Sequence, residues 1–304
     1  MTLTRSTFLA CVLLALCGTA RGEVVTGSSS ADLIDLGLSL DLVPELGGGI
    51  ILNASIDNVA PASGTAPAPY IASDSVLTVD ISSGVLANPV PFSPPLVTVA
   101  DVQTGLVTST ATSNVDGLSG SRTATGEHVI NGLDLSIVET LGVADLLSIS
   151  ATTLEVSSEV SGDYGGLGSV GSLYVEDLII SVAGIAIPGY GGLGVTGFIA
   201  ANTGVALTGP LLGTSLILNQ QIETGDGINS LSLTTNAISL DVSAINIDLV
   251  GALTGTVTVG PTSASLQASA VPEPSSAILL SLVCAGGVWV RRRVKQKTAL
   301  TLAS

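Results

Sequence analysis

The sequence predicts an all-β body of antiparallel strands that lies between two short targeting segments. From residue 36 onwards, apolar residues repeatedly alternate with Ser, Thr, Gly, Asn or Asp, a period of two that places one face of a strand inward and the other outward. Gly-rich clusters separate these runs as turns do, and no stretch of the body has the spacing of an amphipathic helix. We expect a sandwich-like arrangement of the strands, with an irregular β-solenoid as the alternative.

Five groups of alternating apolar residues indicate individual strands. They are Leu36, Leu38, Leu40 and Leu42; Ile50, Leu52, Ala54 and Ile56; Leu133, Leu135 and Ile137; Leu231 and Leu233; and Ile238, Leu240 and Val242. Ile245, Ile247 and Leu249 continue the last group on the opposite parity, which predicts a β-bulge or a strand break between Val242 and Ile245. Turns are expected at Gly165–Gly166, at Gly191–Gly192 and from Gly225 to Gly227.

Proline-rich patches from Pro61 to Pro69 and from Pro89 to Pro95 interrupt the alternation. Because proline cannot donate a hydrogen bond within a central strand, we expect loops, sheet edges or a linker there. The patches divide the body into N-terminal β strands over residues 21–95 and a main β block over 96–270. No repeat period emerges, which disfavours a regular solenoid.

The first twenty residues have the pattern of a secretory signal peptide. Arg5 precedes a short apolar run, and Gly18 and Ala20 supply small residues at the positions that signal peptidase reads. We therefore expect export through the Sec translocon and cleavage after Ala20. All three cysteines (Cys11, Cys17 and Cys284) lie outside the body, so a disulfide framework in the body is excluded.

The charge of the body is strongly one-sided. Residues 23–270 contain 23 acidic residues and one basic residue, Arg122, which gives a net charge of −22. Nucleic-acid binding is therefore not expected, because the neutralisation of phosphates requires Lys and Arg. Anionic polymers should likewise be repelled unless divalent cations bridge them.

The C-terminal 34 residues, 271–304, have three parts in a fixed order: Val271-Pro272-Glu273-Pro274, an apolar run from Ser275 to Val290, and Arg291, Arg292 and Arg293. A helix over the 16 residues of the run would rise about 24 Å, which is short for a bilayer core of about 30 Å. The arginines would remain on the cytoplasmic side, so that the body lies across the membrane. From this pattern alone, a permanent single-pass anchor is the alternative to a processed one.

This three-part tail resembles the PEP-CTERM sorting signal of bacteria that make exopolysaccharide. The resemblance covers Val271–Arg293 and implies that exosortase, a membrane protease, cuts at the Pro-Glu-Pro motif and sends the body to the cell surface or the medium. A second resemblance rests on five segments of the main block: Val129–Leu133, Ile187–Gly189, Leu218–Gln221, Gly225–Gly227 and Leu233–Ile238. In these segments the chain resembles the exported β-rich proteins called choice-of-anchor P, which implies a fold and no particular activity.

Catalytic signals are weak throughout the chain. His128, the only histidine, has no Gly-x-Ser-x-Gly elbow or body cysteine to accompany it, and we expect a solvated loop residue. Two Gly-x-Gly-x-x-Gly patterns, Gly166–Gly171 and Gly189–Gly194, precede strand-like runs rather than helices, so they are interpreted as turns and not as nucleotide sites. We therefore expect no enzyme.

Ligand signals are weak as well, and we expect no cofactor. Asp163 and Asp226 lie in glycine turns and Glu176-Asp177 in a strand, where weak calcium binding is the alternative to solvated acids. Aromatic residues are too few for a conventional sugar platform; Tyr164 and Tyr190, each in a Gly-rich turn, are the pair to test.

The sequence as a whole indicates an exported cell-surface or matrix protein with a non-catalytic structural or interaction role linked to exopolysaccharide. Two alternatives stay open. A secreted hydrolase could act through two carboxylates, one of them with a raised pKa in a concave cleft. A calcium-dependent adhesin would gain thermal stability in millimolar calcium.

Overall fold

The computed structural model describes residues 22–42, 51–56, 61–86, 97–140, 145–212, 214–247 and 251–270. These residues form eighteen β-strands and one short 3-10 helix, η2 (Gly209–Leu211), and they contain no α-helix. Every strand pairing in the two main sheets is antiparallel. The prediction of an all-β chain of antiparallel strands is thus confirmed. The expected signal peptide and the C-terminal segment lie outside the described residues.

The first sheet follows the order β3-β2-β17-β16-β18-β1-β4, with β15 paired to β16 and β14 paired to β15. Its strands are β1 (Gly22–Ala31), β2 (Ile34–Leu42), β3 (Ile51–Ile56), β4 (Ala62–Thr65), β14 (Thr203–Val205), β15 (Ser215–Gly225), β16 (Ser230–Ile247), β17 (Gly251–Val259) and β18 (Thr262–Ala270).

The second sheet follows the order β12-β11-β10-β9-β7-β6, with β13 paired to β11, β8 paired to β9 and β5 paired to β8. Its strands are β5 (Tyr70–Val76), β6 (Val79–Leu86), β7 (Val97–Thr104), β8 (Val107–Ser113), β9 (Arg122–Thr140), β10 (Leu147–Gly162), β11 (Gly168–Val182), β12 (Ile185–Ala186) and β13 (Val195–Phe198).

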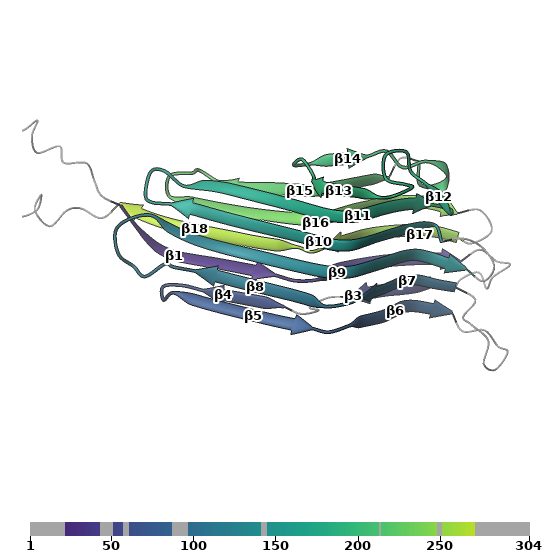
Figure 1. The fold of residues 1–304 in the computed structure, drawn as a ribbon, viewed down its shortest axis with the longest axis horizontal. Coiled ribbons are helices and arrows are strands. Elements are labelled where there is room, and N and C mark those ends of the chain that lie inside the picture. The colour runs from purple at the N-terminus through teal and green to yellow at the C-terminus, as the bar shows by residue number, and fades with distance from the viewer. Residues whose placement is uncertain are drawn as a thin grey trace, which may run out of the picture.

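The strands run nearly along the long axis of the molecule, and several of them are two collinear pieces (Figure 1). β1 and β2 are separated at Asp32–Leu33, directly beside the break between β17 and β18 at Gly260–Pro261; the amide of Asp32 donates to the carbonyl of Pro261 and that of Gly260 to the carbonyl of Leu33. The two breaks are thus aligned in neighbouring strands of the first sheet.

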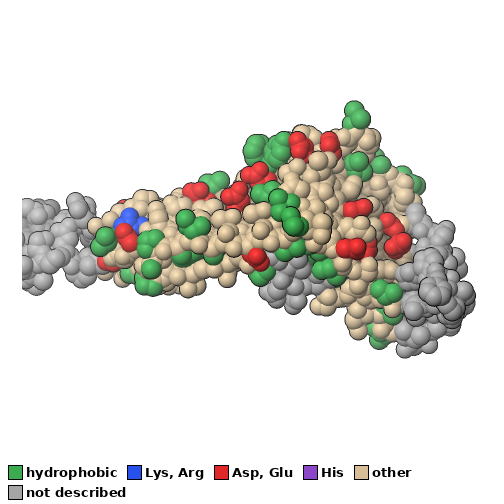
Figure 2. Space-filling view, turned by 60° about the horizontal axis from the view of Figure 1, so that its bottom comes forward, with side chains coloured by type: hydrophobic (Ala, Val, Ile, Leu, Met, Phe, Trp, Pro, Cys, Tyr) green, Lys and Arg blue, Asp and Glu red, His purple; other side chains and the backbone are tan. Residues whose placement is uncertain are grey.

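Two hydrophobic clusters lie between the facing sheets, and the molecule is thinner around one of them than around the other (Figure 2). The narrow end has the smaller cluster: Val24, Val115, Ala124, Val160, Leu167, Leu231, Leu233, Ala264, Leu266 and Ala268. The wide end has a larger cluster of Leu, Ile and Val, among which Leu135, Leu147, Leu154 and Leu173 are fully buried. We refer to the region between the clusters as the waist.

The alternation in the sequence corresponds to burial in the structure. Leu133, Leu135, Ile137, Leu231, Leu233, Ile238, Leu240 and Val242 are buried, as are Leu36, Leu38 and Leu40. The predicted change of parity is also confirmed, because the register of β16 on β17 shifts between Val242 and Ile245. Ser, Thr and Asp occupy the outward positions, so the strands are half-buried as the pattern requires.

Strands from both predicted parts of the body share both sheets. β1 pairs with β18 and β2 with β17, while β5 pairs with β8 and β6 with β7. The predicted boundary near residue 96, with the prolines from Pro89 to Pro95, lies outside the described residues. Pro67 and Pro69 occupy the connection between β4 and β5, where the chain crosses from one sheet to the other.

Candidate functional site

The residues of the expected sorting motif, Val271–Pro274 and Arg291–Arg293, and the expected cleavage residue Ala20 all lie outside the described part of the chain. The structure instead shows where the body meets these segments. Gly22, at the start of β1, pairs directly with Ala270, at the end of β18 (Figure 1). Both ends of the described body therefore meet at the tip of the narrow end.

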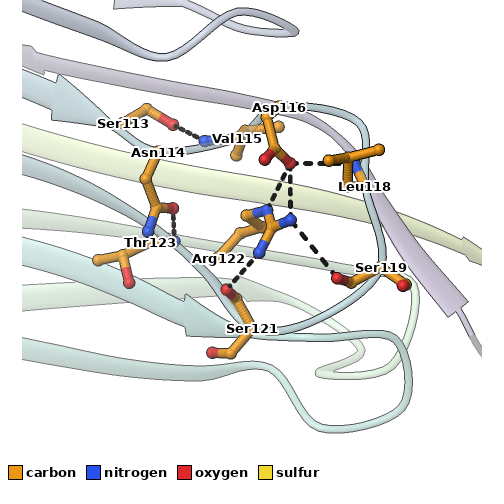
Figure 3. A network of polar contacts seen from close by, with 9 residues as sticks. All are labelled: Ser113, Asn114, Val115, Asp116, Leu118, Ser119, Ser121, Arg122 and Thr123. Atoms are coloured by element: carbon orange, nitrogen blue, oxygen red, sulfur yellow. Dashed lines mark hydrogen bonds and ion pairs between the residues drawn. The ribbon is translucent and has the colours of Figure 1, made fainter.

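A polar network fixes the loop that closes this tip. Arg122 begins β9, and its Nη2 atom lies 2.7 Å from Asp116 Oδ1 while its Nε donates to the same oxygen (Figure 3). The amide of Leu118 also donates to Asp116, and that bond, together with the guanidinium, lowers the pKa of Asp116. Ser119 of the same loop forms a β-bridge with Glu23. The single arginine of the body thus orders the loop beside the first residues of β1.

Acidic side chains are spread over the outside of the wide end (Figure 2). One group of them is on the outer face of the second sheet, where Gln103 Nε2 donates to Asp101 and Ser136 donates to Asp145 across 2.8 Å. Asp134 lies directly opposite Gln103. Partial burial raises the pKa of Asp134, and the carboxylates of Asp145 and Asp101 raise it further. The raised pKa of Asp134 is the direction of shift that a general acid requires.

The grooves that we describe lie elsewhere. A groove of about 410 Å³ beside the breaks in the first sheet is lined by Asp32 and Asp35 together with hydroxyl groups. It shares Ser30 and Ser263 with a neighbouring groove of about 390 Å³ lined mainly by serines. A third groove, of about 750 Å³, lies beside β5 and is lined by Tyr70, Ile71 and parts of β8 and β9 without any carboxylate. Asp134 lines none of the three, so the carboxyl group with the raised pKa lies outside these grooves.

The prediction that His128 is a solvated loop residue is wrong. His128 lies in β9, is fully buried at the waist and has its Nδ1 2.6 Å from Ser109 Oγ. Its Nε2 has no hydrogen-bond partner among the described residues. His128 pairs with Val156 of β10, its ring lies close to Gly260, and burial lowers its pKa to about 4. A substrate cannot reach this Ser-His pair, so it is part of the core.

Three of the acids considered for calcium accept hydrogen bonds from residues of their own turn or of the adjacent strand. Asp226 Oδ1 accepts hydrogen bonds from the amides of Ile228, Asn229 and Ser230, and these bonds, led by that of Ser230, lower the pKa of Asp226. Glu176 accepts a hydrogen bond from Thr153, and Asp177 accepts one from Thr152. Within the described ranges, no three His, Cys, Asp or Glu side chains are grouped so that they could hold a metal ion.

The tyrosines selected from the sequence do not form a pair. Tyr164 packs against the narrow cluster, whereas Tyr190 packs against the wide one. The structure instead brings Tyr174 and Phe198 together, with ring centroids 5.3 Å apart and the rings inclined by 65°. The sequence analysis missed this pair because the two residues are 24 positions apart and meet only through the pairing of β11 with β13.

Comparisons with known proteins add little to this geometry. No protein-family model matches the chain, and no curated protein matches it. Among solved structures, the outer membrane protease OmpT from Escherichia coli aligns over 83% of this chain and 98% of its own, with 9% identity and a TM-score of 0.15. A likeness this low carries no argument. In the part of the chain that the structure describes, no helix has the length and apolar character needed to cross a bilayer.

Proposed function

We propose that this chain is an exported protein of the cell surface or extracellular matrix, with a non-catalytic structural or interaction role linked to exopolysaccharide. Its sandwich-like acidic body would be released or transferred by exosortase cleavage at Pro272-Glu273-Pro274. The sorting step rests on the resemblance of Val271–Arg293 to the PEP-CTERM signal. The position of the two ends of the body supports it independently.

The observation that best supports the proposal is the pairing of Gly22 with Ala270. Cleavage after Ala20 would leave one residue before β1, and cleavage within Val271–Pro274 would leave at most a few residues after β18. Removal of both segments would therefore delete no strand and no buried side chain of the described body. The two sheets would persist after processing.

The same pairing gives the tethered body an orientation. Before cleavage, the narrow tip would be next to the membrane, while the acidic wide end would extend away from anionic headgroups. The narrow tip and the wide end lie at opposite ends of the long axis of the body, along which the strands run (Figure 1). The attachment point next to Ala270 sets this orientation.

The test is the intact mass of the protein from its host, measured separately in surface, medium and membrane fractions. We expect a chain that begins at Arg21 and ends close to Pro272–Pro274, without the arginine cluster. A full-length tail found only in membranes would contradict sorting and leave a permanently anchored protein. Extending the spacer between Ala270 and Val271 is a useful companion variant, because a protease hindered by the folded tip should then cleave faster.

The hydrolase alternative rests on the raised pKa of Asp134 beside Asp101 and Asp145. It predicts that the protein hydrolyses a polysaccharide and that Asp134→Asn abolishes this activity. Asp80→Asn, which changes another acid of the neighbouring strands, should leave the activity unchanged. We favour the non-catalytic role because Asp134 lines none of the three grooves described above. A carboxylate pair that cuts glycosidic bonds must hold the sugar between its two members.

A further inference from the structure

Phe198 is an exposed aromatic side chain in a body that has few aromatics. It is 78% exposed, whereas Tyr70, Tyr164, Tyr174 and Tyr190 are all partly covered. Single exposed apolar side chains are common on protein surfaces and need no explanation. Phe198 differs from them because it contacts a second ring, Tyr174, in an edge-to-face arrangement that leaves an aromatic corner on the outer face of the second sheet.

The backbone holds Phe198 rigidly on both sides. Gly197 pairs with Val175, and the amide of Ile199 donates to the carbonyl of Leu173 across 2.9 Å. The carbonyl of Ile199 in turn accepts a hydrogen bond from Nδ2 of Asn219, a residue that is 3% exposed. Phe198 is therefore exposed on a fixed strand rather than on a mobile loop, so a ligand would meet a ring whose position is already set.

A bulge next to the pair adds a second fixed point. The register of β13 on β11 shifts between Val175 and Leu178, and Asp177 adopts a left-handed conformation with φ of 53°. The hydroxyl of Thr196 accepts the amide hydrogen of Asp177 across 3.1 Å. Thr196 and Phe198 alternate on the outward face of the same short strand. The bulge thus fixes the register that places Phe198 beside Tyr174.

Polar groups border the two rings in register. Glu155 lies directly opposite Tyr174 on β10 and is exposed, which places its carboxylate within reach of anything resting on the ring. On one side of this row, Ser157 and Ser172 share a hydrogen bond of 2.8 Å; on the other, Thr153 donates to Glu176 across 2.9 Å. Along β10 and β11, hydroxyls and carboxylates therefore border the two rings.

These features together fit one class of ligand. The C–H face of a sugar is apolar and weakly positive and packs on the electron-rich face of an aromatic ring, while sugar hydroxyls donate to carboxylates. A protein partner would need a larger apolar surface than two rings. A polymer of uronic acids would be repelled by a body with a net charge of −22.

We propose that the Tyr174–Phe198 pair, with Glu155 beside it, is a binding site for a neutral polysaccharide. The inference deepens the proposed function, on which it rests, by naming the surface and the chemical class of the polymer. The rings supply stacking, and Glu155 supplies a hydrogen-bond acceptor that orients the sugar. Recognition occurs on an open face, as binding to the side of a long polymer requires.

The test is affinity electrophoresis of the protein purified from its host in the form that the host makes. Native gels would contain dextran, galactomannan or mixed-linkage β-glucan as neutral polymers, or alginate as an anionic one. We expect retardation in at least one neutral gel and none in alginate. Phe198→Ala should weaken that interaction about tenfold, the size expected for the loss of one stacked ring.

Three further variants make the result specific. Leu193→Ala removes a side chain that is 95% exposed on a neighbouring turn, and it should leave retardation unchanged. Phe198→Leu should fail like Phe198→Ala, whereas Phe198→Tyr should restore binding, because the ring rather than general apolarity is required. Thermal unfolding should be the same for all of these proteins, since the altered side chains are exposed.

Two results would overturn the inference: no retardation in any neutral gel, or equal retardation of wild type and Phe198→Ala. Neither result bears on sorting, which the intact mass measures separately. A processed chain that binds no neutral polymer would contradict only the proposed binding site. An unprocessed chain that binds a neutral polymer through Phe198 would contradict only the proposed sorting.

Discussion

The narrow and wide ends of the body are built from the same long strands but are filled differently. At the narrow end, alanines such as Ala124 and Ala264 share the core with a few leucines. At the wide end, the corresponding inward positions hold large side chains such as Ile137, Leu147 and Leu154. Because close-packed interiors leave no voids, the separation of the two sheets follows the size of the side chains between them.

At the waist, the two sheets come too close together to leave room for large side chains between them. Gly126 of β9 lies so close to the first sheet that a Cβ atom there would come within 2.8 Å of the carbonyl oxygen of Ser263 and closer still to that of Ser30. Ser158 and Ser29 reach across this short gap: Ser158 bonds to Thr235 and Thr262, and Ser29 bonds to Tyr70 and to the carbonyl of Thr112. Where the sheets are too close for apolar side chains, inter-sheet hydrogen bonds replace them.

The strongest test of this comparison is to force the waist apart. Gly126→Val places a branched side chain against the backbone of two strands, which cannot rotate away, so we expect a loss of about 4 kcal/mol in the free energy of unfolding, above the usual range for overpacking. Gly37→Val is the matched control, because a Cβ atom at Gly37, also in a central strand, meets nothing within 4 Å. Urea denaturation of both variants measures the difference. Equal stability would show that the sheets separate freely.

A second test uses the titration of His128. Burial lowers its pKa from 6.5 in the unfolded chain to about 4 in the folded one, so between these values the unfolded chain binds a proton that the folded chain does not. The free energy of unfolding is therefore unaffected by this group above pH 6.5. It falls by about 3 kcal/mol in total as the pH decreases towards 4, because the unfolded chain then gains a proton on His128 that the folded chain does not. The neighbours of the ring named above, Val156, Gly260 and Ser109, carry no charge that could offset the effect of burial.

The control for that titration is His128→Gln, which retains a polar side chain opposite Ser109 and does not titrate. The many carboxylates of the body also respond to pH, and the difference between wild type and variant cancels their contribution. Urea denaturation from pH 7 to pH 4 should show the wild type losing stability relative to His128→Gln. Parallel pH profiles would mean that water reaches Nε2 and that the waist is more open than the structure shows.

The misinterpretation of His128 shows which part of the fold the sequence could predict. Leu133, Leu135 and Ile137 alternate with polar residues, so their inward face was predicted correctly. Further back in the same strand, the inward residues are Ala124, Gly126 and His128, and a period of two carries no hydrophobic signal when the inward positions are small or polar. The outward alternation of Thr125 and Glu127 was the available sign of a strand.

The candidate sugar site was beyond prediction for a different reason. The parity change at Ile245 could be detected because both halves of that strand are apolar. The bulge at Glu176–Asp177 is flanked by a short strand of four residues whose pairing partner no local pattern specifies. The contact between Tyr174 and Phe198 depends on that pairing, so it emerges only from the assembled sheet.

The smallest expected effect concerns the hydrogen bonds that join the sheets at the waist. Ser158→Ala removes a buried hydroxyl that lies 2.8 Å from Thr235 Oγ1 and 2.9 Å from Thr262 Oγ1, whereas Thr262 keeps its bond to the carbonyl of Thr235. We expect a loss of about 1–2 kcal/mol in the free energy of unfolding, because Thr262 keeps one hydrogen bond while the hydroxyl of Thr235 loses its bond to Ser158. Ser157→Ala, which removes the neighbouring outward hydroxyl and its bond to Ser172, should cost less than about 0.5 kcal/mol at a solvated site. If thermal unfolding showed equal losses for the two variants, the hydroxyls between the sheets would contribute no more than those on the surface, and the narrow waist would depend on Gly126 alone.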